Sequence, residues 1–201
     1  MATNPQHEAD FGFPIVKLSN NRAQMGMSLV LRLKDNTPRG VQEKLFVGVT
    51  DYAATPHVYL SHAIDGPVFR VVAHEVLQHR FAQAVTEGLF GKDPASRVLA
   101  QDGVTRYQWT DFKGGGRADT AGVHSRILSL SFLDRPGHEY PWTLVLSEGP
   151  GRLVGAGAVI PTGAPLQRVQ MSLSPMQLLQ WMALGVEALA ACTTGAFRGA
   201  R

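Results

Sequence analysis

The stretch Ser174-Pro175-Met176-Gln177 is the clearest helix start in this chain. Serine is a preferred N-cap, proline suits the first helical position, and glutamine three residues after the serine can close a capping box. Short alternating segments between Thr105 and Leu173 lead into this helix. A similar set of four between Met27 and Ala73 leads into an amphipathic segment from His74 to Leu89. The order predicts a pseudo-repeated β4-α-β4-α chain of the α+β class, with two antiparallel sheets each followed by a helix.

The alternation predicts which side chains of the first sheet face outward. Strands are expected over 27–34, 44–50, 57–61 and 68–73, with apolar residues on one face of each. In the second half, Tyr107 and Trp109 share one strand face, and Arg106 and Gln108 share the other. The outward residues of the first sheet mix cations with rings: Arg32, Lys34, Lys44, Phe46, His57 and Tyr59.

Basic and aromatic residues on one surface are typical of proteins that hold single-stranded nucleic acid, in which cations bind phosphates and rings stack on bases. The expected phosphate contacts are Arg22, Arg32, Lys34, Lys44 and Arg70, and the expected base contacts are Phe46, Tyr59, Tyr107 and Trp109. The alternative is that rings such as Phe46, Tyr59 and Trp109 are buried against a helix, an arm or another subunit.

Composition limits the class of protein. The chain has 201 residues, 44% of them hydrophobic, which is enough for one folded domain, expected over 26–192 between an arm (1–25) and a tail (193–201). Its charge of +3 permits a polyanionic partner without requiring one. The single cysteine, Cys192, excludes a disulfide within the chain and is expected in the core, with a reactive thiol as the alternative. No stretch has the length or apolarity of a signal peptide or a membrane span, so a reducing, cytoplasmic location is expected.

The motifs give little support for catalysis. His74 and His79 flank a glutamate, but they are one residue too far apart for the metalloprotease helix motif. Gly88-Leu89-Phe90-Gly91-Lys92-Asp93 lacks the spacing of a phosphate-binding loop. We therefore expect a protein that is not an enzyme and needs no metal or cofactor. A metal-dependent enzyme that uses His57, His62, His74 or His79 is an alternative.

Three stretches are similar to the Whirly family of single-stranded-DNA-binding proteins. Arg22-Ala23-Gln24-Met25-Gly26-Met27-Ser28 stands where that family has a Lys-Gly-Lys-Ala-Ala-Leu-Ser motif. Phe90-Gly91-Lys92-Asp93-Pro94 resembles the family's Phe-His-Asp-Pro helix exit. Arg168-Val169-Gln170-Met171-Ser172-Leu173-Ser174 resembles its last strand and the start of its last helix. Together the three stretches frame most of residues 22–191.

The resemblance implies a fold, a ligand and an assembly. By position, Arg22 matches the first lysine of the motif and Ser28 its serine, whereas Gln24 replaces the second lysine and Ala23 the glycine. The implied function is binding of single-stranded DNA with little sequence specificity, in replication, recombination or repair, by a homo-oligomer that is a tetramer in that family. RNA is an alternative ligand, because mitochondrial guide-RNA-binding proteins share the architecture.

The last helix also favours an oligomer, because its apolar side chains exceed what one sheet need cover. These side chains are Trp181, Met182, Leu184 and Leu189. A different class remains open: a structural or virion assembly protein, whose sheets pair with neighbours and which binds nucleic acid weakly.

Overall fold

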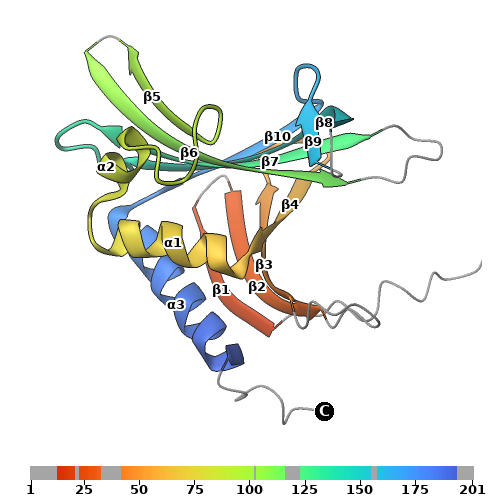
Figure 1. Cartoon of the computed structure of the whole chain (residues 1–201), viewed down its shortest axis with the longest axis horizontal. Coiled ribbons are helices and arrows are strands. Elements are labelled where there is room, and N and C mark those ends of the chain that lie inside the picture. The colour runs from red at the N-terminus through yellow and green to blue at the C-terminus, as the bar shows by residue number, and fades with distance from the viewer. Residues whose placement is uncertain are drawn as a thin grey trace, which may run out of the picture.

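The computed structural model describes residues 13–20, 23–32, 42–101, 103–115, 123–154 and 158–193. Its first sheet is antiparallel, with strands in chain order (Figure 1). The strands are β1 (Phe13–Ser19), β2 (Ala23–Arg32), β3 (Gln42–Asp51) and β4 (Val58–Asp65). Helices α1 (Gly66–Leu77) and α2 (Phe81–Thr86) follow.

The second sheet is also antiparallel and has the order β10-β8-β7-β6-β5, with β9 paired to the far half of β8. Its strands are β5 (Ser96–Gln101), β6 (Val104–Gly115), β7 (His124–Asp134), β8 (Trp142–Val154), β9 (Ala158–Pro161) and β10 (Gln167–Leu173). Helix α3 (Pro175–Thr193) completes the described chain. The α+β class is confirmed, but this sheet is larger than the four strands expected.

The capping box that opens α3 is confirmed. The Ser174 backbone N–H donates to Gln177 Oε1 at 3.0 Å, and the Gln177 N–H donates to Ser174 Oγ at 3.3 Å. These reciprocal bonds satisfy backbone donors that have no partner inside the first helical turn. The helix then buries Leu178, Met182 and Leu189, as its spacing predicts.

The strand expected over 68–73 is wrong, because these residues lie in α1. Pro67 stands in the first helical turn, where its missing N–H costs nothing. The buried residues of α1 include Phe69, Val72, Ala73 and Val76, a spacing of three and four that places one stripe against the core. The β-branched valines alone suggested a strand, whereas packing at the helical period decides the structure.

The helix expected over 74–89 is interrupted. His79 has a positive φ of 56°, and two bonds close the end of α1: Arg80 N–H to the Glu75 carbonyl (2.8 Å) and His79 N–H to the Val76 carbonyl (3.0 Å). This pattern is the Schellman motif, which ends a helix on a left-handed residue. The chain therefore turns before α2 begins at Phe81.

Other expected boundaries also differ. Strand β1 lies inside the segment expected to be an arm, and it pairs with β2 across a register shift between Pro14 and Val16. Strand β5 has no counterpart among the expected strands. The sequence Gly149-Pro150-Gly151 is typical of a hairpin turn, but β8 runs through these residues and pairs with β9 beyond them.

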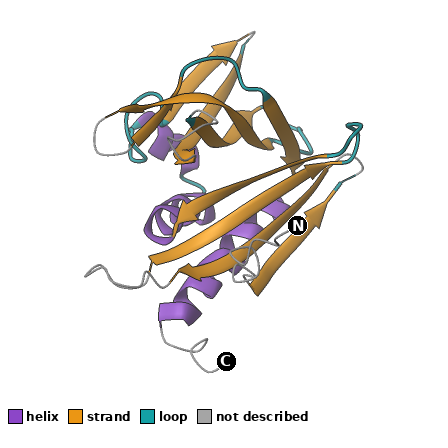
Figure 2. Cartoon of the chain, turned by 90° about the vertical axis from the view of Figure 1, so that its right-hand side faces the viewer, coloured by secondary structure: helices purple, strands orange, loops and turns teal. Residues whose placement is uncertain are grey.

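The core lies where the inner faces of the two sheets meet the helices. Figure 2 shows α1 and α3 behind the first sheet, and no helix of the described chain covers its opposite face. Trp181 of α3 is fully buried and lies 6.1 Å from the Phe69 ring of α1, measured between centroids. Met182 and Leu189 are buried and Leu184 is half-buried within this single chain, so these side chains are covered without a second subunit. The burial of this helix therefore gives no separate evidence for an oligomer.

Candidate nucleic-acid interface

The predicted alternation along β3 and β4 is confirmed. Leu45, Val47 and Val49 are buried, as are Leu60 and Ile64, so the intervening residues face away from the core. We call the opposite surface the first-sheet outer face. It consists of Lys44, Phe46, Gly48 and Thr50 of β3 with Tyr59, Ser61, Ala63 and Asp65 of β4.

Tyr59 lies over a glycine on this face. A Cβ built on Gly48 would meet Tyr59 Oη at 2.6 Å and Cε2 at 2.8 Å, so the ring rests directly on the backbone of the neighbouring strand. The residue is nevertheless 62% exposed. One side of the ring is supported by the sheet while much of the side chain stays open to solvent, which is the arrangement that base stacking requires.

The other predicted residues of the first sheet have different surroundings. Lys44 forms an ion pair with Asp65 at 3.4 Å, and Phe46 is half-buried. His57 lies in the loop before β4, where its Nδ1 is 3.1 Å from the Ala54 carbonyl oxygen. Register places three predicted residues of β2 beside β3: Gln24 opposite Thr50, Ser28 opposite Phe46 and Arg32 opposite Gln42. Arg22 and Lys34 lie outside the described residues.

Three predicted residues do not reach this face. Arg70 is on α1, not on a strand, and its Nη2 donates to the Leu189 carbonyl of α3 at 3.1 Å, so it links two helices. Trp109 is only 3% exposed and packs in the core, so its ring is closed to a base. Tyr107, also on the inner side of β6, is half-buried and stacks on Phe132 at 6.4 Å between ring centroids. The strand faces of β6 were predicted correctly, but the aromatic face is the inner one.

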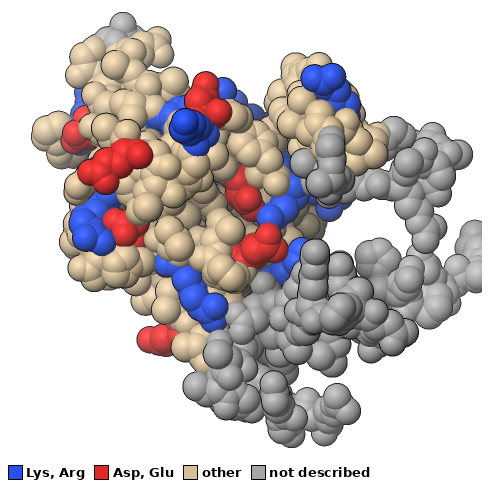
Figure 3. Space-filling model, in the orientation of Figure 1, with Lys and Arg blue, Asp and Glu red and all other residues tan. Residues whose placement is uncertain are grey.

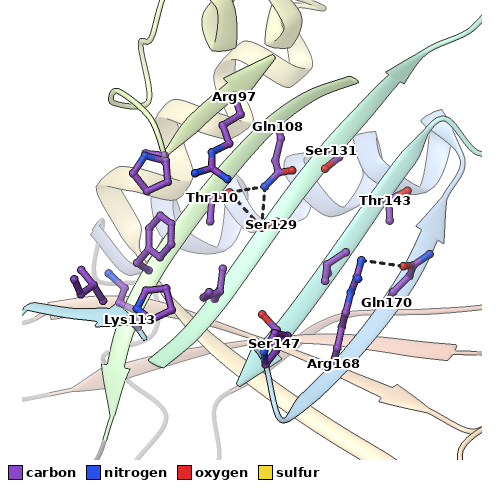
Figure 4. Close-up of a pocket in the computed structure, with 18 of the residues that line it drawn as sticks. Arg97, Gln108, Thr110, Lys113, Ser129, Ser131, Thr143, Ser147, Arg168 and Gln170 are labelled. Atoms are coloured by element: carbon purple, nitrogen blue, oxygen red, sulfur yellow. Dashed lines mark hydrogen bonds between the residues drawn. The ribbon is translucent and has the colours of Figure 1, made fainter. Parts of the chain in front are cut away.

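The outer side of the second sheet forms a groove of about 1310 Å³, which we call the second-sheet groove (Figure 4). Outward side chains of β6, β7, β8 and β10 make its floor. One wall is β9 with the loop after it, which contributes Val159, Ile160, Pro161 and Pro165. The other comes from the segment entering β5, with Pro94, Ala95 and Arg97.

Two glycines in β8 allow β9 and the loop after it to pack closely against β8. A Cβ on Gly151 would lie 2.7 Å from Val159 Cγ1, and one on Gly149 would lie 3.0 Å from Pro165 Cα. The Leu166 N–H also donates to the Glu148 carbonyl at 2.9 Å. The wall therefore depends on close backbone approach at two positions where a side chain would clash.

The floor of the groove is rich in hydroxyl and amide groups. Gln108 Nε2 donates to Thr110 Oγ1 at 2.9 Å and lies 3.4 Å from Ser129 Oγ, which places three polar side chains in one network. Figure 4 shows this network near Arg97 and a second polar pair, Arg168 with Gln170, on the far side of the floor. The remaining hydroxyls of the floor are Ser131, Thr143 and Ser147.

The lining of the groove carries one sign of charge. It includes four cationic residues, Arg97, Arg106, Lys113 and Arg168, and no carboxylate among the described residues. Arg97 pairs with Asp93 outside the lining, whereas Arg106 and Arg168 form no ion pair with another described residue. On the described part of the face seen in Figure 3, by contrast, charges of both signs are interspersed.

A chain of polar contacts joins the groove to the first-sheet outer face. Lys113 lines the groove and reaches Asp65 Oδ2 at 2.7 Å, while Asp65 Oδ1 pairs with Lys44. Asp111 Oδ2 lies 3.7 Å from Lys113 Nζ and 2.9 Å from Nε2 of His62, whose side chain is 1% exposed. Burial raises the pKa of Asp65, but the hydrogen bond and charge of Lys113, with the charge of Lys44, outweigh it and hold that pKa below 3.8.

The described histidines do not gather into a metal centre. Within the described part of the chain, no group of three His, Cys, Asp or Glu side chains is placed to hold an ion. Glu75, which lies between the two histidines of the rejected metalloprotease motif, instead accepts two hydrogen bonds from Arg80 at 3.1 and 3.0 Å. Among the described helices, none has both the length and the apolarity to cross a membrane.

A comparison with protein-family models and with curated protein sequences found no match for this chain.

Sequence reasoning missed the second-sheet groove. Its signal was present in the alternation of each strand, because Gln108 and Thr110, or Arg168 and Gln170, fall on one face. The order β10-β8-β7-β6, which brings those faces together, is a property of the tertiary structure.

Proposed function

We propose that this protein binds single-stranded nucleic acid with little sequence specificity. The observation that carries the proposal is the second-sheet groove, whose lining has four cationic side chains and no described carboxylate; Arg97 and Lys113 pair with carboxylates outside the lining, whereas Arg106 and Arg168 form no such pair within the described chain. A phosphate backbone is the common biological polymer that matches a long surface of this charge. Hydroxyl and amide groups on the floor can bond to phosphate, sugar or base edges, and this favours binding without a strict sequence.

The Tyr59 ring supports a preference for single strands over duplex. A base can stack on an exposed ring only when its face is free, and the faces of bases inside a duplex are already stacked. Because the ring is already held against Gly48, little side-chain freedom is lost when a base binds. Lys44, on the same face, supplies a cation for the adjoining phosphate.

The proposal includes the finer features implied by the Whirly resemblance. These are single-stranded DNA as the main ligand, a role in replication, recombination or repair, and assembly into a homo-oligomer. The observed order of a sheet, a helical segment, a second sheet and a last helix supports this comparison. Hydroxyl groups on the groove floor are also suitable partners for a ribose 2′-OH, so RNA belongs in the same test.

The test is fluorescence anisotropy with labelled single-stranded DNA, single-stranded RNA and duplex DNA over a salt series. We expect single strands to bind more tightly than duplex, with a log–log salt slope of about −0.7 per phosphate neutralised. Arg106→Ala and Arg168→Ala should each weaken binding and make the slope shallower by about 0.7. Equal affinity for duplex, or no binding at low salt, contradicts the proposal.

Arg135→Ala is the matched control. Arg135 is exposed in the turn after β7 and is absent from the groove lining, so its loss removes the same charge without touching the site. It should leave the affinity and the slope nearly unchanged. Light scattering of the free protein measures the oligomer separately.

A further inference from the structure

We propose that Asp65 occupies a phosphate-binding site between Lys44 and Lys113, where a nucleic-acid strand crosses from the second-sheet groove to the first-sheet outer face. This inference rests on the proposed function and names one subsite within it. In the free protein the Asp65 carboxylate occupies the position of the phosphate. Both groups carry negatively charged oxygens on one central atom.

Lys44 and Lys113 hold the Asp65 carboxylate between them, and we call this arrangement the clamp. Lys113 Nζ reaches Asp65 Oδ2 at 2.7 Å and Lys44 Nζ reaches Asp65 Oδ1 at 3.4 Å, so each ammonium group takes one oxygen. The lysines come from different sheets, β6 and β3, and converge from the two surfaces of the proposed interface. The three side chains are 28%, 25% and 41% exposed for Lys113, Lys44 and Asp65, so a ligand can reach them.

Asp65 can leave the clamp without disrupting the fold. It occupies the N-cap position of α1, yet its side chain makes no capping hydrogen bond. Ion pairs this exposed are weak, so a phosphate can replace the carboxylate at small cost. Asp111 Oδ2 lies 3.7 Å from Lys113 Nζ, so this ammonium group keeps a carboxylate neighbour when Asp65 leaves.

The clamp also lies at a suitable place along the path of a bound nucleic-acid strand. At 3.3 Å per residue, Tyr59 is roughly 20 Å from Asp65 along β4, and Arg106 is roughly 23 Å from Lys113 along β6. A path over both segments is therefore about 40 Å long, which corresponds to about 12 nucleotides at a stacked spacing of 3.4 Å.

The test uses Asp65→Asn in the full chain, with an oligothymidylate of about 20 nucleotides, longer than the path and than most single-strand binding sites. Without the carboxylate, Lys44 and Lys113 carry a larger net positive charge, so they neutralise the bound phosphate more fully and release more of the cations condensed on the strand. We expect the affinity to rise about two- to fivefold and the salt slope to steepen by about 0.7. The Asp65 side chain makes no capping hydrogen bond and its ion pairs are partly exposed, so the melting temperature at neutral pH should fall only slightly.

The control is Glu87→Gln, which makes the same change in net charge at an exposed position of the helical layer, where the Glu87 carboxylate accepts a hydrogen bond from Gln83 Nε2. It should leave the slope unchanged. Lys44→Met is a second variant of the site, and it should weaken binding and make the slope shallower by about 0.7.

The failures of the subsite and of the function are distinguishable. If the wild-type protein binds the strand but Asp65→Asn leaves the slope unchanged or lowers the affinity, the crossing site is wrong and the general function stands. An unaltered slope in Lys44→Met leads to the same conclusion. If the wild-type protein binds no single strand at low salt, the proposed function itself fails.

Discussion

Replacement of Tyr59 by alanine separates a stacking role from a packing role. Because the side chain is 62% exposed and rests on Gly48, its loss uncovers little of the core. Loss of a stacked base is worth about 1–3 kcal/mol, which corresponds to a roughly 5- to 150-fold weaker Kd for single strands. The assay is anisotropy with a labelled single strand, with thermal unfolding measured on the same sample. We expect weaker binding with a nearly unchanged Tm.

Two further variants, one at Tyr59 and one at Gly48, test this prediction more closely. Tyr59→Phe keeps the ring and should retain most of the affinity. Gly48→Ala places a Cβ 2.6 Å from the Tyr59 hydroxyl oxygen, so the ring must lift from the sheet, and binding should weaken although no ligand contact is removed.

Trp109→Ala provides the opposite pattern. The residue is 3% exposed, so truncation should cost about 3–5 kcal/mol of stability and lower the Tm by roughly 6–20 °C, with little change in the affinity of the folded protein. A Tyr59→Ala protein that resembles Trp109→Ala, with a lower Tm and normal affinity, would refute the stacking argument.

Three other predictions concern stability. Ser174→Ala removes one acceptor of the α3 capping box and should lower the free energy of unfolding in urea by about 1 kcal/mol; no loss would mean that the cap contributes nothing. Asp111→Ala leaves the buried Nε2 of His62 without its acceptor and should cost about 1–3 kcal/mol in the same assay, and Asp111→Asn, which keeps an acceptor, should cost less. The lowered pKa of Asp65 means that its ionised form stabilises the fold above pH 3.8 and loses this effect as the pH falls through the folded-state pKa. The stability difference between wild type and Asp65→Asn should therefore shrink below pH 3.8 in urea titrations, and a difference independent of pH would contradict the cause assigned.

The first sheet and α1 show what the alternation of apolar and polar residues can and cannot predict. The prediction that Leu45, Val47 and Val49 face inward was correct, because one face of an antiparallel strand must meet the core and the period of two follows from the backbone. The same reasoning failed over 68–73, where valines favour a strand but Pro67 and the buried stripe of α1 form a helix. Propensity is a weak local preference that burial of a stripe overrides.

The sequence alone determined the features that depend on neighbours along the chain. These are the capping box at Ser174 and the faces of β3, β4 and β6, all of which follow from spacings of a few residues. Only the tertiary structure decided that Trp109 faces the core and that Tyr59 rests on Gly48. It also brought four strands into one groove and two lysines from different sheets onto Asp65. The physical reason is that strand order and sheet packing bring together residues that are far apart in the chain. Alternation predicts which face of a strand a side chain lies on, but it does not predict which elements pack against that face.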